Sequence, residues 1–365
     1  MARRVLVAMS GGVDSSVVAH LLAAEGHEVL GVTMRLGNHD TVEPDADKPT
    51  CCGLDGIRDA RRVAAQLDIP YYAVNYEQLF AEKVVDYFAD EYLNGRTPNP
   101  CVMCNQELKF GKLLELADDI GADYVATGHY ARIDCTPDGH NPAHGPGLTL
   151  RRARDASKDQ TYVLFSMTQS QLSRTLFPLG DMTKDEVRDV AREMGLITAE
   201  KAESQDICFI PDDDYRRFLR ERLPGAVEPG VIADADGREV GRHSGAANYT
   251  VGQRRGLGIA AAAPVYVTEI QAGANVVVVG SSDKLLRSAC DVERVNWVAG
   301  EPPMSPVEAT VKIRYRDDGA PAKVFPAEHG TARVDFVEPR RAITPGQAAV
   351  FYDGDLVLGG GWIGP

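Results

Sequence analysis

Residues 10–16 read Ser-Gly-Gly-Val-Asp-Ser-Ser, and they stand between an apolar run and a helical pattern. The run Val5–Met9 is typical of a buried strand, and Val17–Ala24 has helical apolar spacing. We expect the two glycines to form a tight turn and a helix to start at Asp14 or Ser15. Backbone N–H groups of such a turn, together with the positive end of the helix dipole, form an anion site. The stretch therefore predicts a phosphate-binding unit of strand, loop and helix.

This loop is not the common nucleotide loop in which a Lys follows the glycines. It resembles the pyrophosphate loop (PP-loop) of ATP pyrophosphatases. That resemblance implies cleavage of ATP between its α and β phosphates and adenylylation of a substrate. ATP and Mg²⁺ are the implied cofactors, with Asp14 orienting a metal ion or a hydroxyl. An ordinary Gly-Ser turn is the alternative, and the flanking strand and helix patterns disfavour it.

Composition limits the class of protein. With 365 residues, the chain is too long for one typical core and predicts two or three domains. Its 44% hydrophobic and 25% charged residues are typical of soluble globular proteins. We find neither a signal peptide nor an apolar stretch long enough to cross a bilayer, so we expect a cytoplasmic protein without a membrane partner.

Charge bears on the expected partners. The net charge of −14 disfavours a protein that coats nucleic acid nonspecifically. Arginine nevertheless recurs in clusters, each of which alone is typical of a solvated surface. Together they are compatible with an RNA partner, because Arg binds phosphate well. The clusters are Arg151-Arg152-Arg154, Arg216-Arg217-Arg220-Arg222, Arg254-Arg255, Arg314-Arg316 and Arg340-Arg341.

The first half of the chain alternates strand and helix patterns. The predicted strands are Val5–Met9, Glu28–Met34, Tyr71–Val74 and Tyr124–Thr127. The predicted helices are Ser15–Ala24, Gly56–Gln66, Glu77–Leu93, Glu107–Asp119 and Lys184–Met194. Such alternation predicts an α/β fold, with a parallel sheet flanked by helices. Ligands then bind at the carboxyl ends of the strands, where residues 10–16, Met34 and Gly128-His129 lie.

The second half has a different texture. Residues 134–149, rich in Pro, Gly and His, are typical of an exposed insertion between two strands. From about Asp206 onward, short strands follow one another, as in a small β domain or barrel. They are Val265–Ile270, Val276–Val279, Val307–Tyr315 and Ala348–Tyr352. We expect a PP-loop catalytic domain over residues 1–205, a small central domain over 206–280 and a C-terminal β-barrel-like domain over 281–365.

The cysteines suggest chemistry rather than cross-linking. There are seven, at positions 51, 52, 101, 104, 135, 208 and 290, and an odd number argues against a disulfide scaffold. In Thr-Pro-Asn-Pro-Cys-Val-Met-Cys-Asn (97–105), we expect a helix to begin just after Cys104. A helix N-terminus lowers the pKa of a thiol, so Cys104 is a candidate nucleophile. A buried cysteine, or half of a Cys-x-x-Cys pair with Cys101, are the alternatives. Cys208, between Ile and Phe, is by itself typical of a core residue.

Six motifs together resemble the bacterial tRNA-specific 2-thiouridylases, which make 2-thiouridine at the anticodon wobble position. They are Ser-Gly-Gly-Val-Asp-Ser-Ser (10–16), Thr-Pro-Asn-Pro-x-x-x-Cys-Asn (97–105), Thr127-Gly128-His129-Tyr130, Lys158-Asp159-Gln160, Ser204-Gln205-Asp206-Ile207-Cys208-Phe209 and Tyr249-Thr250-Val251-Gly252-Gln253-Arg254. The resemblance extends from the N-terminus to Pro345-Gly346-Gln347, essentially the whole chain.

The resemblance implies a role for each site residue. Cys104 is the nucleophile, Cys208 carries a persulfide, and Asp14 serves adenylylation. A disulfide between the two cysteines is an expected product. ATP contacts Ala8, Met9, Ser10, Gly11, Gly12, Val13, Asp14, Ser15, Met34 and Gly128. The anticodon stem-loop of tRNA contacts Asn99, Pro100, Cys101, His129, Lys158, Asp159, Gln160, Arg254, Tyr315, Arg316 and Gln347. The implied sulfur donor is a cysteine desulfurase or a sulfur-relay protein.

The implied chemistry leaves alternatives open. AMP on the uracil O2 makes that oxygen a leaving group, and sulfur then attacks C2 of a base flipped out of its stack. Either the Cys208 persulfide attacks directly, or Cys104 releases hydrosulfide from it. Cys101 stands where some relatives have Asp, and with Cys104 and Cys208 it could hold an iron–sulfur cluster, which we do not favour. We predict no other metal site. A ligase that forms a C–N bond and a nucleotide-binding RNA adaptor are the remaining alternatives, and neither explains the two cysteines.

Overall fold

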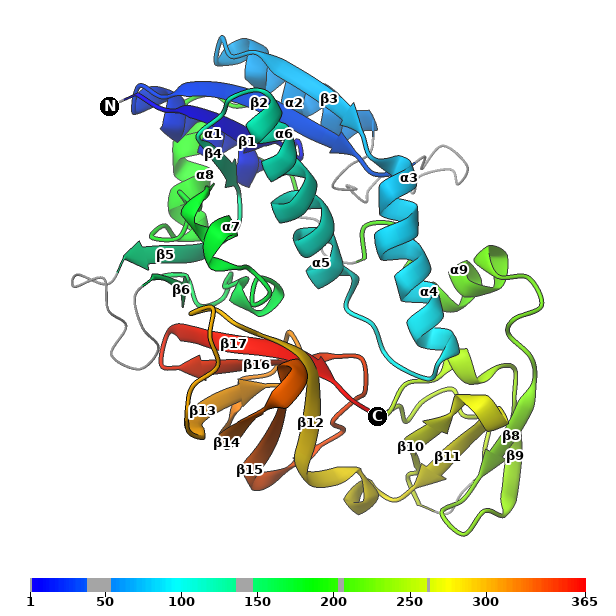
Figure 1. The fold of residues 1–365 in the computed structure, drawn as a ribbon. Helices are drawn as coiled ribbons and strands as arrows, with labels where there is room; N and C mark the ends of the chain where they lie inside the picture. The colour runs from blue at the N-terminus through cyan, green and yellow to red at the C-terminus, as the bar shows by residue number, and fades with distance from the viewer. Residues whose placement is uncertain (1, 38–53, 136–146, 203–206, 261–262) are drawn as a thin grey trace.

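The computed structural model describes residues 2–37, 54–135, 147–202, 207–260 and 263–365 (Figure 1). A five-stranded parallel sheet in the order β3-β2-β1-β4-β7 forms the N-terminal part. Its strands are β1 (Arg4–Ala8), β2 (Glu28–Arg35), β3 (Tyr71–Asn75), β4 (Tyr124–Thr127) and β7 (Thr175–Leu176). The helices are α1 (Val13–Ala24), α2 (Leu54–Gln66), α3 (Glu77–Phe80), α4 (Asp86–Leu93), α5 (Pro100–Met103), α6 (Leu113–Asp119), α7 (Gln169–Ser173) and α8 (Lys184–Glu193). The predicted α/β class is confirmed.

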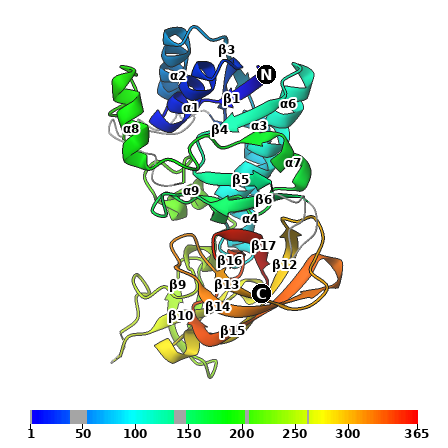
Figure 2. The same cartoon turned by 90° about the vertical axis from the view of Figure 1, so that its left-hand side faces the viewer.

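Helices cover both faces of this sheet, which is why β1 is apolar at successive positions. Side chains alternate along a strand, so Val5 and Val7 face one side and Leu6 the other. The two valines belong to a core cluster with α1, α2 and α8. Leu6 belongs to a second cluster, with residues from β2 and from the α3–α6 helices. The view in Figure 2 shows these two groups of helices on opposite sides of the strands.

The predicted elements of this half are confirmed with small shifts, and two features differ. Between α3 and α4 the helix continues as a π-helical turn, Ala81–Val85, and another such stretch, Cys104–Lys112, joins α5 to α6. The helix expected to begin after Cys104 begins at Pro100 instead. A proline suits the first helical position, because its missing N–H would have no partner there. Cys101, and not Cys104, therefore lies in the first turn.

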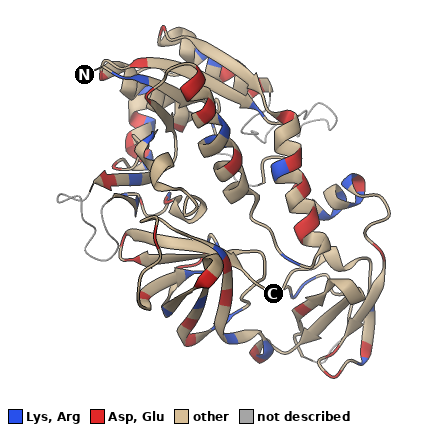
Figure 3. Ribbon diagram, in the orientation of Figure 1, with Lys and Arg blue, Asp and Glu red and all other residues tan. Residues whose placement is uncertain are grey.

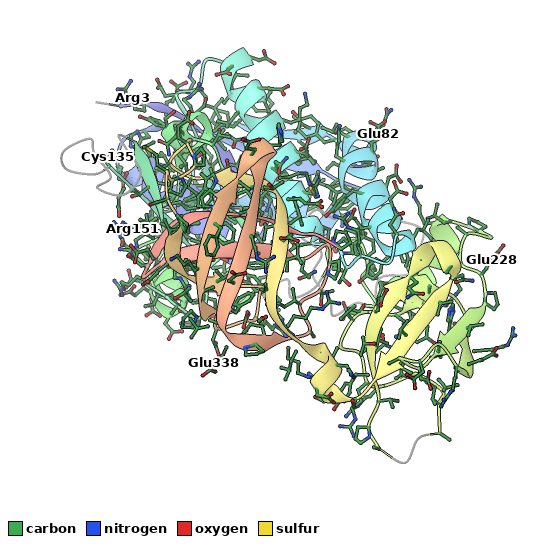
Figure 4. The ribbon with its side chains drawn as sticks, turned by 60° about the horizontal axis from the view of Figure 1, so that its bottom comes forward. Arg3, Glu82, Cys135, Arg151, Glu228 and Glu338 are labelled. Carbon is green, nitrogen blue, oxygen red and sulfur yellow. The ribbon has the colours of Figure 1, made fainter. Side chains whose placement is uncertain are left out.

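The second half is all-β apart from α9 (Tyr215–Arg222) and short 3₁₀ turns in the described ranges. A four-stranded sheet has the order β10-β11-β8-β9. Its strands are β8 (Gly230–Ala233), β9 (Glu239–His243), β10 (Tyr266–Gln271) and β11 (Val276–Gly280). The barrel strands are β12 (Leu286–Trp297), β13 (Val307–Lys312), β14 (Ala320–Ala327), β15 (Thr331–Arg341), β16 (Ala348–Asp353) and β17 (Leu356–Ile363). Antiparallel pairing of β12 with β17 closes the barrel. Figure 4 shows this barrel beside the four-stranded sheet, and Glu228, which precedes β8, lies on the side away from the barrel.

One strand of the β region ends earlier than predicted, and one hairpin makes a pairing that was not expected. The strand predicted over Val307–Tyr315 ends at Lys312, which leaves Tyr315 in the following loop. The insertion predicted over 134–149 is flanked by β5 (Ala131–Cys135) and β6 (Leu148–Arg152), while residues 136–146 lie outside the described part. Strand β6 pairs with β17, so this hairpin extends the barrel sheet. The predicted domain limits at residues 205 and 280 stay predictions.

No helix in the described ranges is both long and apolar enough to span a membrane.

Candidate functional site

The loop after β1 has a conformation that only glycine permits. Gly11 has a φ of +75°, and a Cβ added there would lie 2.1 Å from the carbonyl oxygen of Gly56 on α2. The backbone N–H of Ser10 donates to Ser15 Oγ at 3.1 Å. The Ser16 hydroxyl donates to the Gly12 carbonyl at 2.8 Å. These bonds fix the turn at the N-terminus of α1, where the helix dipole favours an anion.

Asp14 lies at this helix start and has a buried cation as its partner. Lys184 Nζ is 2.7 and 2.9 Å from the two carboxylate oxygens of Asp14, and the Tyr130 hydroxyl donates to Oδ1 at 2.8 Å. The side chain of Lys184 is 9% exposed and that of Asp14 is 31% exposed. Lys184, the first residue of α8, was not found from the sequence, because a single Lys at a helix start forms no motif.

The other residues expected around ATP line the same edge of the sheet. Met34, at the end of β2, is buried in the second core cluster. Gly128 follows β4 and packs against the start of α1, since a Cβ there would lie 3.0 Å from both Asp14 Cβ and Ser15 N. Ala8 ends β1. All of them surround the carboxyl ends of the central strands, where α/β folds bind ligands.

Cys104 and Cys208 border one apolar cluster. Both pack, half-buried, against the cluster that contains Leu6, Met34 and Phe80. Phe209 anchors the second cysteine, because its ring meets Phe80 edge-on at 5.6 Å between centroids. No disulfide joins the two cysteines in this structure. The sequence motif around Cys208 begins at residues 204–206, which lie outside the described part.

Because the helix starts at Pro100, the expected effect of the helix dipole on Cys104 does not apply. The dipole effect fades beyond the first helical turn, and Cys104 lies just after that turn. Cys101, in the first turn, is exposed. Among the described residues, no three His, Cys, Asp or Glu side chains are placed to hold a metal ion, so Cys101, Cys104 and Cys208 form no such group in this conformation.

The barrel holds the loop that precedes Cys101. Gln347 Nε2 donates to the carbonyl oxygens of Thr97 at 3.0 Å and Pro98 at 3.2 Å. The Thr97 N–H donates to the Pro345 carbonyl at 2.8 Å. Asn99 precedes the helix, and Pro100 is buried at its start. Gln347 was expected to contact tRNA; in this structure its side chain holds the loop that precedes Cys101.

Several of the residues expected at tRNA lie close enough to Tyr315 to act on it electrostatically. Tyr315 is 45% exposed, and its partial burial raises the pKa of its hydroxyl. The charge of Asp159, and that of Cys101 in its ionised form, raise this pKa further. The positive charges of Lys158 and Arg316 oppose that shift. The structure therefore brings three segments together, from the Cys101 loop, the 158–160 turn and the loop after β13.

Asp159 and Gln160 shape the turn itself. Asp159 Oδ2 accepts a hydrogen bond from the Thr161 hydroxyl at 2.8 Å, and Oδ1 accepts from the Ala153 N–H at 3.2 Å. Gln160 Oε1 accepts from the N–H of Tyr130 at 2.9 Å. Through Tyr130, whose hydroxyl donates to Asp14, this turn is linked to the loop at residues 10–16.

His129 is buried, with 7% of its surface exposed. Its ring lies near Phe110 and Phe177, and its nitrogens lie 2.7 Å from Thr127 Oγ1 and 3.4 Å from Lys109 Nζ. Burial, and secondarily the Lys109 charge, hold the pKa of His129 well below its ordinary value. The imidazole is therefore neutral at physiological pH.

Arg254 is exposed in a loop of the middle domain, next to exposed Arg255. Arg216 of α9 extends toward the same loop, since a Cβ added to Gly256 would lie 3.9 Å from its Nη1. Figure 3 shows Lys and Arg on α9, and acidic and basic residues mixed along the barrel strands. The basic surface is thus local, as the net charge requires.

Family models match three consecutive parts of the chain. A model described as a tRNA methyl transferase HUP domain matches residues 3–212. A model described as a tRNA methyl transferase PRC-barrel domain matches residues 216–281. A model described as an aminomethyltransferase β-barrel domain matches residues 287–363.

Individual relatives match almost the whole chain. A protein of Geotalea uraniireducens (strain Rf4), named tRNA-specific 2-thiouridylase MnmA, is 51% identical over 363 residues, covering 99% of this chain and 95% of that protein. A protein of the same name from Solibacter usitatus (strain Ellin6076) is 52% identical over 371 residues, covering 98% of each chain. One from Clostridium acetobutylicum is 46% identical over 363 residues and covers 100% of both.

Proposed function

The chain belongs to the tRNA-specific 2-thiouridylase family, and on that premise we propose that it thiolates the wobble uridine of tRNA at C2 in an ATP-dependent reaction. The observation that carries the proposal is the placement of Cys104 and Cys208. Both border one apolar cluster that reaches the carboxyl end of β2 at Met34. This position near the carboxyl ends of the strands supports a role for both cysteines close to a phosphate bound by residues 10–16.

In the first step the loop binds the phosphates of ATP. The N-terminus of α1 and the Ser10 and Ser15 hydroxyls favour the anion there. Mg²⁺ suits this site, because it takes one or two carboxylates together with phosphate oxygens. Asp14 would hold it, since each carboxylate oxygen can accept more than the bonds from Lys184 and Tyr130. The ion would neutralise phosphate charge. The uracil O2 attacks the α phosphate, and pyrophosphate leaves.

In the second step sulfur replaces the activated oxygen. A persulfide on Cys208, received from a donor protein, supplies the sulfur. The Cys104 thiolate attacks Cys208 Sγ, a Cys104–Cys208 disulfide forms and hydrosulfide is released. Hydrosulfide adds to C2 of the uracil ring, and AMP departs with the oxygen. A later reduction by an external thiol restores both cysteines.

Two other reactions are less well supported. The matching family model is named for a methyl transferase, and methyl transfer has no use for two cysteines beside a pyrophosphate loop. A C–N ligase would use the loop but would also leave both cysteines without a role. The half-buried cysteine pair therefore favours thiolation.

The decisive assay incubates the protein with ATP, a sulfide donor and unmodified tRNA. We expect 2-thiouridine and pyrophosphate in equal amounts. Pyrophosphate without 2-thiouridine would contradict thiolation and favour the ligase. If neither product forms, the result would contradict every reaction that adenylylates tRNA and would favour a nucleotide-binding adaptor.

A charge reversal tests the RNA surface. Arg254→Glu with Arg255→Glu should weaken tRNA binding and lower the slope of log affinity against log salt by about two, because fewer counterions are released. Filter binding across a salt series measures both. The control is Arg242→Glu on β9, where the arginine pairs with Glu239 at 3.2 Å. Unchanged binding by the double variant would assign these arginines to a solvated surface only.

A further inference from the structure

Cys104 lies where the usual sources of thiolate stabilisation do not reach. It packs, half-buried, against an apolar cluster, and such surroundings disfavour a charged thiolate. The helix dipole acts on the first turn, which ends before Cys104. Among the described residues of this cluster, the other titratable groups are Cys208 and Tyr76, and neither can carry a positive charge. A nucleophilic thiolate at Cys104 therefore needs a cation from outside the cluster.

Lys109 lies one helical turn after Cys104. Both belong to the π-helical stretch Cys104–Lys112, and in a π-helix the hydrogen bonds join residues five apart. Leu108, the residue before Lys109, packs in the same cluster as Cys104, so the two turns share this face. Side chains on a helix lean toward its N-terminus, so that of Lys109 extends back over the turn that holds Cys104. Lys109 is itself half-buried, which weakens the screening of its charge by water.

His129 holds the ammonium group of Lys109 in place. Lys109 Nζ lies 3.4 Å from His129 Nε2, and His129 Nδ1 lies 2.7 Å from Thr127 Oγ1. The imidazole is neutral at physiological pH, because burial lowers its pKa. An ammonium group can only donate, so Nε2 accepts from Lys109 and the Nδ1–H donates to the Thr127 hydroxyl. A neutral acceptor orients the cation without cancelling its charge, which can then act on an anion nearby.

We propose that Lys109 is a positioning residue that stabilises the thiolate form of Cys104. The thiol proton leaves to water, and Lys109 keeps its own proton throughout. The thiolate is the species that attacks Cys208 Sγ in the proposed reaction. The inference deepens the proposed function, since it explains how Cys104 becomes a nucleophile, yet the charge pair itself requires neither ATP nor tRNA.

The pH dependence of Cys104 alkylation tests the charge pair. The reduced full-length protein reacts with iodoacetamide over a range of pH, and peptide mass spectrometry gives the rate at each cysteine. Lys109→Met should move the midpoint of the Cys104 profile upward by at least about one pH unit, the lower end of the effect of a close opposite charge. Tenfold less thiolate below the midpoint, partly offset by its greater nucleophilicity, should slow the reaction at least about threefold. Lys109→Arg should restore most of the wild-type profile, because it keeps the charge.

Lys112 provides the matched control on the same π-helical stretch. Its Nζ pairs with Glu115 at 2.6 Å, and its side chain is 38% exposed. Lys112→Met removes the same charge farther from Cys104 and should leave the midpoint where it is in the wild type. An unmoved midpoint in Lys109→Met, or an equal rise in Lys112→Met, would overturn the proposal.

The rate at high pH separates this electrostatic role from a structural one. Above the midpoint the thiolate is fully formed, so the Lys109→Met variant should react there at least as fast as the wild type. A lower rate at high pH with an unmoved midpoint would assign Lys109 to packing alone and overturn the proposal. Alkylation uses no ATP or tRNA, so a wild type that forms no 2-thiouridine would contradict the proposed function and leave this result unaffected.

Discussion

Replacing either Cys104 or Cys208 by serine is expected to lower thiolation of tRNA by at least about a thousandfold, since loss of a reacting nucleophile removes several decades of rate. The first turnover of pyrophosphate should persist in both variants. The two sites differ in place: the cysteines border the apolar cluster, whereas we propose that the phosphates bind at the start of α1. Nucleoside mass spectrometry of the tRNA and a single-turnover pyrophosphate assay measure the two steps separately.

Two further cysteine variants sharpen this result. Cys135→Ser, at the exposed end of β5, should retain full activity. Cys101→Ser should retain substantial activity if Cys208 carries a persulfide. If three cysteines instead hold an iron–sulfur cluster, Cys101→Ser should lose both iron and activity. Equal loss in Cys101→Ser and Cys104→Ser, with iron bound to the wild type, would therefore contradict the persulfide route.

Substitution of Asp14 should lower both the rate of ATP–pyrophosphate exchange and the free energy of unfolding. Asp14→Ala leaves the 9%-exposed Lys184 without its carboxylate, and breaking a buried pair costs about 3 kcal/mol. ATP–pyrophosphate exchange with tRNA present should fall at least about a hundredfold, because the variant loses the carboxylate that we propose acts at the reacting phosphates. Urea denaturation and the exchange assay give the two effects.

A double variant separates stability from chemistry. Asp14→Ala combined with Lys184→Met removes both charges, so stability should largely return while exchange stays low. Asp55→Asn, an 87%-exposed carboxylate on α2, is the control and should change neither. Recovery of exchange in the double variant would show that Asp14 acts only by neutralising Lys184.

The sequence predicts the parts of the site that are local. The strand, glycine turn and helix around residues 10–16 are specified within a short stretch, and the structure has them in that order. Asn99 and Pro100 also carried a local signal for the helix start, because an Asn before a Pro is typical of a helix N-terminus. We instead expected the helix to start after Cys104. For that reason we expected the helix dipole to act on the Cys104 thiol, whereas Cys101 lies in the first turn.

The remaining features depend on contacts between distant segments. Lys184 and Tyr130 meet Asp14 only because α8 and β4 flank the start of α1. The β5–β6 hairpin joins the barrel through one pairing with β17, which no periodicity along β6 predicts. Gln347 was expected from its motif, but its bonds to the Thr97 loop follow from the docking of the barrel.

We propose that sulfur reaches tRNA from Cys208, with Cys104 as its partner. The most direct measurement is a single turnover of protein loaded with isotopically labelled persulfide, given ATP and unmodified tRNA without reductant. Mass spectrometry then analyses both the tRNA nucleosides and the protein peptides. We expect labelled 2-thiouridine and a Cys104–Cys208 disulfide in equal amounts. Since a disulfide needs Cα atoms within about 7 Å, its appearance would also require the two segments to approach. Unlabelled product, or a disulfide that pairs Cys101 with Cys104 and never reaches Cys208, would contradict the account.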